Sequence, residues 1–105
     1  MVVKSKDAIQ KTFLGVDFVV LSVGEKSMVT KMLYKQTDNV PKHSHPNEQS
    51  GYVISGQYKL KMNNNVYLLA SGDSYCIPIN VEHSLEIIKE GEVVDVFTPP
   101  REDYL

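Results

Sequence analysis

Short stretches of alternating apolar and polar residues, separated by turns, constrain this chain more than any other feature. The segment GQYKLKMN places Tyr58, Leu60 and Met62 on one side and two lysines on the other. A period of two is typical of a β-strand with one buried face, whereas an amphipathic helix needs apolar residues three and four apart. No window of ten or more residues shows a helical stripe. The pattern therefore predicts an all-β protein.

Further apolar runs of strand length follow one another along the chain. They are VDFVVLSV, MVTKMLYKQ, GYVIS, VYLLA, SYCIPI, HSLEII and EVVDVF. Turn-forming residues separate them, in VGEKS, DNVP, SG, NNN, SGD, PINVE and KEGE. Strands at this close spacing predict a sandwich or a small barrel. Pro99 and Pro100 are expected to end the last strand, because proline cannot donate a hydrogen bond to a neighbouring strand.

Length and composition exclude several classes of protein. The 105 residues, 42% hydrophobic and 23% charged, suffice for one ordered domain, which we place at residues 1–105. The basic residues are scattered and the formal charge is −2, so no nucleic-acid or acidic-membrane partner is predicted. The N-terminus has no apolar signal segment, and no apolar run is long enough to span a membrane. These features predict a soluble, cytoplasmic protein.

A single cysteine, Cys76, excludes an internal disulfide and fits a reducing compartment. We expect it to be a small buried core residue that is dispensable for chemistry. Because Tyr75 precedes it on the same predicted strand, only one of these two side chains can point toward a central site.

The chain has three histidines, and two of them stand close together in KHSHPNEQ. His43 and His45 are two apart, so on a strand both imidazoles project to the same face. Pro41 is expected to break the strand before the pair, and Pro46 after it. His83 follows a later strand and turn, where an antiparallel barrel would bring it alongside. Imidazole is the commonest protein ligand of transition metals, so a metal site competes here with the simpler interpretation of surface polar residues.

The surroundings of the histidines resemble the two sequence motifs of the cupin superfamily. The first motif has His-x-His, an acidic or amide ligand four residues later, and a glycine seven residues after that. Its counterparts here are His43, His45, Gln49 and Gly56. The second motif runs from a glycine through a proline to a histidine. Its counterparts are Gly72, Pro78 and His83, with Asn80 in place of a further glycine. The resemblance implies a cupin-type jelly-roll β-barrel (a double-stranded β-helix).

The resemblance also implies a divalent metal held by His43, His45, Gln49 and His83. Spacing selects Gln49 over Glu48, because Glu48 would put a serine at the glycine position of the first motif. Glu48 is then expected to be a solvated carboxylate. Three neutral imidazoles and a glutamine leave a divalent ion near +2, a strong Lewis acid toward anionic ligands. Zn, Ni, Mn, Fe, Co and Cu all accept these ligands, so the identity of the metal stays open.

The C-terminal run DVFTPPREDYL carries further candidate residues. Asp95 alternates with apolar residues on a strand, where an unpaired buried charge is costly, and an edge strand with Asp95 facing water is the alternative. Arg101 follows two prolines that restrict its position, and arginine suits bidentate binding of a carboxylate. A weak surface pair of Arg101 with Glu102 or Asp103 is the simpler interpretation.

This run resembles one group of cupins, the pectin-degradation proteins that ketonise 4,5-unsaturated uronates. The resemblance is carried by Gln49 and by the closing Asp-x-Phe-x-x-x-Arg of Asp95, Phe97 and Arg101. It implies that the last three are catalytic residues over the metal, acting on a small anionic sugar from pectin or alginate. A cupin dioxygenase acting on a small organic substrate, and a non-catalytic sugar- or metal-binding cupin, are the alternatives. Apolar strand faces beyond the needs of one thin barrel predict a homodimer.

Overall fold

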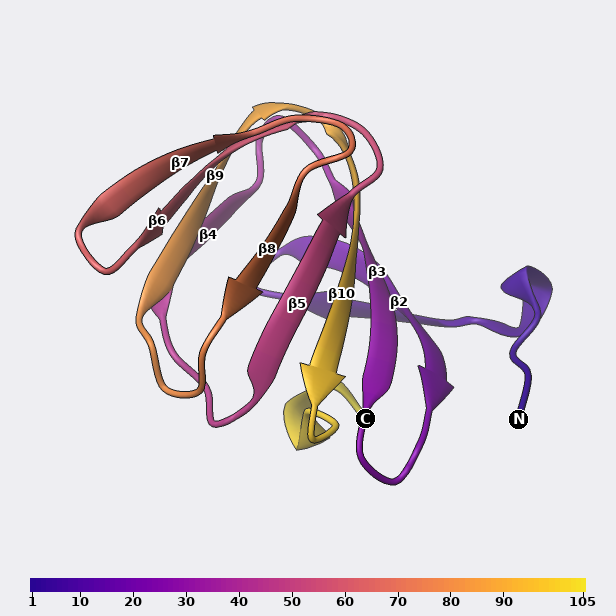
Figure 1. The fold of residues 1–105 in the computed structure, drawn as a ribbon. Coiled ribbons are helices and arrows are strands. Elements are labelled where there is room, and N and C mark those ends of the chain that lie inside the picture. The colour runs from indigo at the N-terminus through magenta and orange to yellow at the C-terminus, as the bar shows by residue number, and fades with distance from the viewer.

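The computed structural model describes residues 1–105 as ten antiparallel β-strands in two facing sheets (Figure 1). The strands are β1 (Ile9–Phe13), β2 (Val16–Val23), β3 (Met28–Tyr34), β4 (Asn39–His43), β5 (Glu48–Val53), β6 (Gln57–Met62), β7 (Asn65–Leu69), β8 (Ser74–Ile77), β9 (His83–Lys89) and β10 (Gly91–Thr98). Two short 3-10 helices span Ser5–Asp7 and Glu102–Tyr104. One sheet has the order β1-β2-β3-β10-β5-β8, and the other β4-β9-β6-β7. Together they form the predicted jelly-roll barrel.

The core lies between the two sheets and is built from alternate residues of the strands. Every second residue of β3 is buried, and Val93, Asp95 and Phe97 share the inner face of β10, as the alternation predicted. Tyr58 and Leu60 of β6 are buried in the same way, with the lysines on the other side. The inner faces thus enclose an apolar interior, where a polar side chain needs a hydrogen-bond partner.

Two strands depart from the predicted pattern. The sequence pattern does not predict β1, whose residues IQKTF include three consecutive polar side chains and which pairs with β2 alone. The sequence predicts a turn at DNVP and a strand break at Pro41. In the structure, β4 runs through Pro41 to His43. Proline is tolerated here because β4 lies at a sheet edge, where its register with β9 shifts between Val40 and His43. His45 therefore lies beyond the end of β4 rather than on a strand.

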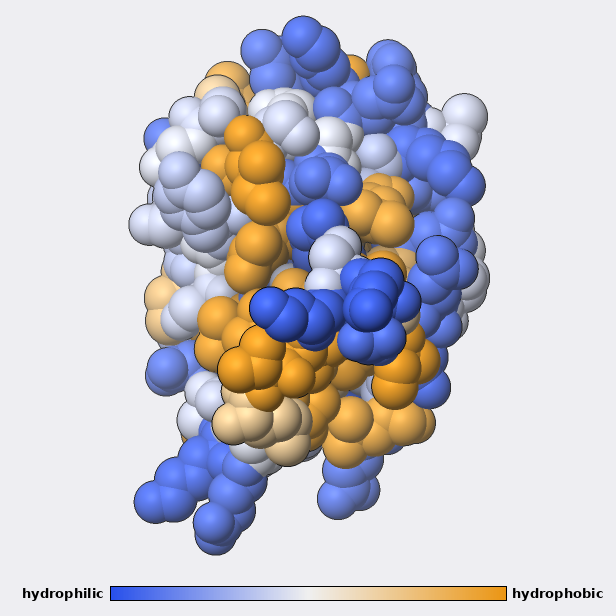
Figure 2. Space-filling view, turned by 90° about the vertical axis from the view of Figure 1, so that its right-hand side faces the viewer, coloured by the Kyte–Doolittle hydropathy of each residue, from blue (hydrophilic) through white to orange (hydrophobic).

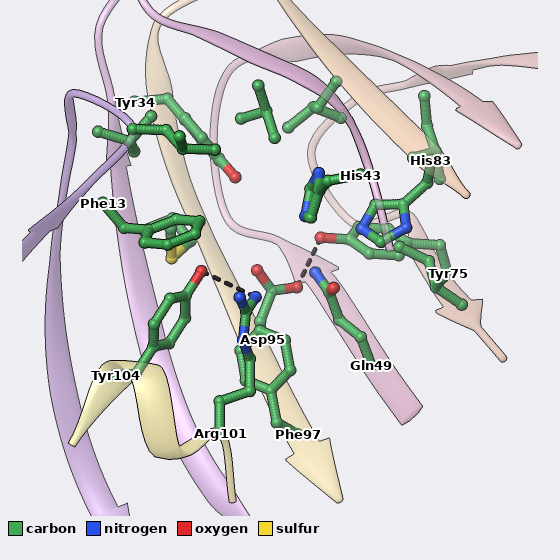
Figure 3. Close-up of a pocket in the computed structure, with 17 residues that line it drawn as sticks. Phe13, Tyr34, His43, Gln49, Tyr75, His83, Asp95, Phe97, Arg101 and Tyr104 are labelled. Atoms are coloured by element: carbon green, nitrogen blue, oxygen red, sulfur yellow. Dashed lines mark hydrogen bonds between the residues drawn. The ribbon is translucent and has the colours of Figure 1, made fainter. Parts of the chain in front are cut away.

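Cys76 is exposed, so the prediction of a buried core cysteine is wrong. It lies on β8, at the edge of the six-stranded sheet, next to Tyr75. Alternation along a strand leaves only one of the two neighbours on the inner face, and Tyr75 takes that place (Figure 3).

The outer face of the six-stranded sheet carries apolar side chains that no element of the chain covers. Val19 of β2, Val29 of β3, and Val94 and Val96 of β10 point outward and are half-buried. Val29 and Val96 are register neighbours. Seen from the side where the N-terminus projects, hydrophobic residues gather over much of the lower half of the molecule (Figure 2). The structure contains no helix of the length and hydropathy needed to cross a membrane.

Candidate metal centre

The three histidines come from two segments far apart in the sequence and meet inside the barrel. His43 ends β4 and His83 begins β9, and the two are direct neighbours across this strand pair. His45 lies in the loop after β4, and its carbonyl accepts a 2.8 Å hydrogen bond from the amide of Asn80 in the turn before β9. Asn80 has a φ of 61°, which asparagine tolerates. One ring nitrogen from each histidine lies within 4.8 Å of the other two.

Backbone carbonyls orient all three imidazoles in the same way. Nδ1 lies 2.9 Å from a carbonyl oxygen in each case: that of Pro41 for His43, of Asn47 for His45, and of Val81 for His83. Because a carbonyl can only accept, each Nδ1 carries the proton and each Nε2 keeps a free lone pair. The backbone thus selects the tautomer that leaves the three Nε2 atoms free to bind a metal ion.

Gln49 adds a fourth donor from β5, on the opposite sheet. Its side chain is buried, and Oε1 lies 3.0 Å from Nε2 of His45. Its amide group also interacts with Asp95, whose pKa it lowers. With the His45 proton on Nδ1, the facing Nε2 and Oε1 are both acceptors, and a shared cation relieves their repulsion. These donors fit a divalent transition metal ion held by three imidazoles and one amide oxygen. Glu48, in contrast, is exposed, as expected.

Burial favours the neutral form of two of the imidazoles, those of His45 and His83. It lowers the pKa of His83 to about 4. Burial, together with the nearby charge of Arg101, also lowers the pKa of His45. Neutral imidazole is the form that binds metals, so no proton has to leave these two rings at neutral pH.

Asp95 lies in the middle of the six-stranded sheet, so the alternative of an exposed edge strand is wrong. Its strand β10 pairs with β3 on one side and β5 on the other, and Asp95 is 1% exposed. Burial raises the pKa of Asp95 to about 6, while hydrogen bonds from Tyr75 and Gln49 and the charge of Arg101 work in the opposite direction. A carboxyl group with such a pKa can take up and release a proton near neutral pH.

Tyr75 reaches Asp95 across a glycine (Figure 3). Its hydroxyl donates a 2.6 Å hydrogen bond to Oδ1 of Asp95. Asp95, Gly51 and Tyr75 stand in register on β10, β5 and β8, and a β-carbon on Gly51 would collide with the Tyr75 ring. The sequence reasoning missed this contact. The strand pattern can indicate that Tyr75 points inward, but its contact with Asp95 depends on the order of the strands.

Arg101 is also buried, with 4% exposed. Its guanidinium binds the carboxylate of Asp103, and it donates a further hydrogen bond to the hydroxyl of Tyr104. The predicted pairing with Asp103 is therefore present, but the arginine is not a surface residue. Phe97 lies between the two groups of polar residues: its ring centroid is 5.7 Å from that of His45 and 5.2 Å from the guanidinium carbon.

One cavity joins most of these groups. It is lined by His43, Gln49, His83, Asp95, Phe97 and Arg101, together with apolar side chains. A more open hollow of about 490 Å³ lies between the His45 loop and the C-terminal segment. The hollow shares Phe13, His43 and Arg101 with the cavity and includes His45. Six of the seven predicted site residues therefore line the cavity, and His45 lines the neighbouring hollow.

Comparison with known proteins identifies the family to which this geometry belongs. Residues 30–97 match the family model described as the cupin domain. The chain belongs to the cupin family. The matched range contains the four candidate metal ligands of this cupin, together with Asp95 and Phe97, whereas Arg101 lies just beyond it.

Individual relatives agree with this assignment. A pectin degradation protein, KdgF, from Dickeya dadantii is 32% identical over 65 residues. The match covers 60% of this cupin and 59% of that protein, so it spans less than two thirds of the relative. An RmlC-like cupin from Shewanella frigidimarina has a TM-score of 0.89 and 23% identity, covering 97% of this chain and 93% of that one. KdgF from Halomonas sp. has a TM-score of 0.85 and 19% identity, covering 98% and 96%. At these identities the two solved structures show the shared cupin fold.

Proposed function

We propose that this cupin is a metal-dependent enzyme that promotes ring opening and ketonisation of 4,5-unsaturated uronate monosaccharides from pectin or alginate breakdown. The observation that carries the proposal is the buried Asp95 beside the four metal-binding side chains. Tyr75 holds one of its oxygens, and the other faces the cavity (Figure 3). The similarity to a pectin degradation protein supports the substrate class.

The site residues have separate proposed roles in metal binding, substrate binding and shaping the cavity. His43, His45, Gln49 and His83 would hold a divalent ion (Zn, Ni, Mn, Fe, Co or Cu), which acts as a Lewis acid toward substrate oxygens. Arg101 binds the carboxylate of the substrate through charge-assisted hydrogen bonds. Phe97 packs between the histidines and Arg101, where it shapes the cavity and excludes water.

Asp95 is the proposed proton carrier. Ring opening removes a proton from the anomeric hydroxyl and breaks the bond between the anomeric carbon and the ring oxygen, which leaves an aldehyde and an enolate. Ketonisation then delivers a proton to the alkene carbon and leaves a ketone at the carbon that bore the ring oxygen. One proton moves from oxygen to carbon, and no further reactant is consumed. Asp95 accepts the first proton and supplies the second.

The proposal includes the setting expected from the sequence. The protein acts as one domain over residues 1–105, as a homodimer in the cytoplasm, on a small anionic sugar. A non-catalytic binder of anionic sugars is a weaker candidate, because a carboxylate in its pocket would repel the ligand. A dioxygenase is distinguished by its need for oxygen, so turnover of the uronate under strict anaerobiosis excludes it.

Replacing Asp95 by Asn tests the proposal. Asparagine keeps the size and an acceptor for Tyr75, but it cannot carry a proton. We expect Asp95→Asn to lose about 100-fold or more in turnover of an unsaturated uronate. Metal content and uronate binding should be kept. The loss of conjugated-alkene absorbance measures turnover, and elemental analysis measures the metal. Arg101→Ala should weaken binding as well as turnover. If Asp95→Asn converts the sugar as fast as the parent, Asp95 is not the proton carrier.

A further inference from the structure

Arg101 has donors that no acceptor of the chain uses. Nε and Nη2 donate to the two carboxylate oxygens of Asp103 over 3.1 and 2.6 Å, and Nη1 donates to the hydroxyl of Tyr104 over 3.0 Å. A guanidinium has five N–H bonds, so one remains on Nη1 and one on Nη2. The edge formed by Nε and Nη2 is already occupied by Asp103. An incoming carboxylate therefore has to use the remaining N–H groups of Nη1 and Nη2, which we call the free edge.

Aromatic rings restrict the ligand to that edge. The guanidinium carbon lies 4.0 Å from the ring centroid of Tyr104 and 5.2 Å from those of Phe13 and Phe97. The flat faces of the group are thus packed against rings, and little of Arg101 reaches bulk water. Because buried donors without an acceptor are costly, a ligand acceptor at the free edge gains more than it would at the surface.

Tyr104 offers a third donor at the same place. Its hydroxyl oxygen accepts the hydrogen bond from Arg101, and no acceptor of the chain takes its proton. Burial raises the pKa of Tyr104 to about 12, so the hydroxyl stays protonated at neutral pH. Both side chains line the cavity that contains Asp95, His43 and His83, and Figure 3 shows them side by side below Phe13.

Asp103 has a different role, because it lies outside the cavity. Its side chain is 49% exposed, so water screens its charge, whereas the side chain of Arg101 is 4% exposed. A buried guanidinium without a counter-charge is strongly destabilising. The bidentate contact from Asp103 therefore compensates the charge from the solvent side and fixes the direction of the free edge.

We infer that Arg101 and Tyr104 form a carboxylate subsite for a sugar acid, in which Tyr104 is the additional donor and Asp103 is a positioning residue. Two N–H groups and one O–H group match the lone pairs of a carboxylate. This inference rests on the proposed function, since it assigns the acid group of the uronate to Arg101 and Tyr104. It makes Tyr104, at the end of the short helix Glu102–Tyr104, part of the binding site.

Binding measurements with two stable sugars test the subsite. D-galacturonate carries the carboxylate, and D-galactose is its neutral counterpart. Tyr104→Phe keeps the ring and removes only the hydroxyl. We expect it to bind galacturonate about 10-fold or more weakly by calorimetry, with galactose binding unchanged. Asp103→Asn should lower the preference for galacturonate in the same direction. Glu102→Gln is the matched control, because this exposed neighbour makes no side-chain hydrogen bond or ion pair and should bind as the parent does.

The outcomes separate this inference from the proposed function. If the parent prefers galacturonate and Tyr104→Phe shows the same preference, the tyrosine is not part of the subsite, while the proposed function stands. If the parent does not distinguish galacturonate from galactose, both are overturned. Kinetics with an unsaturated uronate add a readout that a purely structural role would not give. Tyr104→Phe and Asp103→Asn should mainly raise KM, whereas Asp95→Asn should mainly lower kcat.

Discussion

The hydrogen bonds of the three imidazoles and Gln49 determine which of their atoms can bind a cation. The Nδ1–H group of each histidine donates a hydrogen bond to a backbone carbonyl, and Oε1 of Gln49 faces Nε2 of His45. The remaining atoms are lone-pair donors that face one another. A cation between them turns repulsion into attraction, whereas an empty site has no such compensation. Metal binding should therefore stabilise the fold as well as supply chemistry.

Loss of one imidazole should remove the metal and leave the barrel folded. His45 lies in a loop, outside the strands, so His45→Ala removes a ligand without breaking a sheet. We expect metal content to fall to a small fraction of the parent value, with an unchanged far-UV circular dichroism spectrum. Glu48→Gln is the control: it changes an exposed carboxylate next to Gln49 and should keep the metal. A fully metallated His45→Ala protein would show that the ligand assignment is wrong.

Asp95 should make the stability of the metal-free protein depend on pH. Its pKa rises from 3.8 to about 6 on folding. The folded state therefore holds this proton more tightly than the unfolded state, and stability falls as pH rises through this window. Asp95→Asn does not titrate, so it should gain stability relative to the parent between pH 4 and 6 and keep that gain above pH 6, by about 1–3 kcal/mol. Thermal melts of chelator-treated protein measure the difference, and one that is constant from pH 4 to 8 would contradict the assignment.

At the scale of elements, the order β10-β5-β8 creates the contact between Asp95 and Tyr75. The three strands place Asp95, Gly51 and Tyr75 in one row, and the absent side chain of Gly51 lets the tyrosine ring cross β5. A row of this kind depends on strand order and register together. A slip of one residue would turn the inward side chains of β5 to the outer face.

Gly51→Ala should break this row. The added methyl collides with the Tyr75 ring, so we expect a loss of about 1–3 kcal/mol in stability and loss of the hydrogen bond to Asp95. Gly24→Ala is the control, because a β-carbon there meets only the Ser27 carbonyl oxygen at 3.6 Å. If the clash is the cause, Gly51→Ala should cost little when Tyr75 is already Ala. Denaturant unfolding of the four variants measures both effects, and an equal cost in the two backgrounds would exclude the clash.

At the scale of the whole molecule, one sheet face lacks a partner. Val29 and Val96 are neighbours on the outside of the six-stranded sheet, and Val19 and Val94 lie on the same face on either side of Lys31. Contiguous apolar surface of this kind usually marks an interface. A two-fold pairing of this face would bury the same valines on both copies.

We expect a homodimer at micromolar concentration, measured by light scattering. Val29→Asp should shift it toward the monomer, because the change places an unpaired charge at the centre of the apolar face. Leu68→Asp on β7 is the control, since Leu68 is 72% exposed and belongs to the other sheet. A monomeric parent protein refutes the expectation, as does a Val29→Asp variant that remains fully dimeric.

The sequence by itself determined the fold class and the candidate metal ligands. The fold class is encoded in local alternation, and the ligands follow from the resemblance to the two cupin motifs. The alternation along β3, β6 and β10 reports which side chains face inward, and the spacing after His45 selects Gln49 over Glu48. Asn80 adopts the positive φ that the motif requires at that place. Such features depend on neighbours within a few residues, so they can be read without knowing how the strands are arranged.

Only the tertiary structure decided which strands are central and which partners meet. Asp95 is buried because β10 lies between β3 and β5, whereas Cys76 is exposed because it points outward from the edge strand β8. Pro41 remains in a strand because that strand is an edge. The contact between Tyr75 and Asp95 likewise depends on the order of the sheet. Strand order is set by contacts between residues far apart in the chain, and alternation within one strand is the same at the centre of a sheet and at its edge.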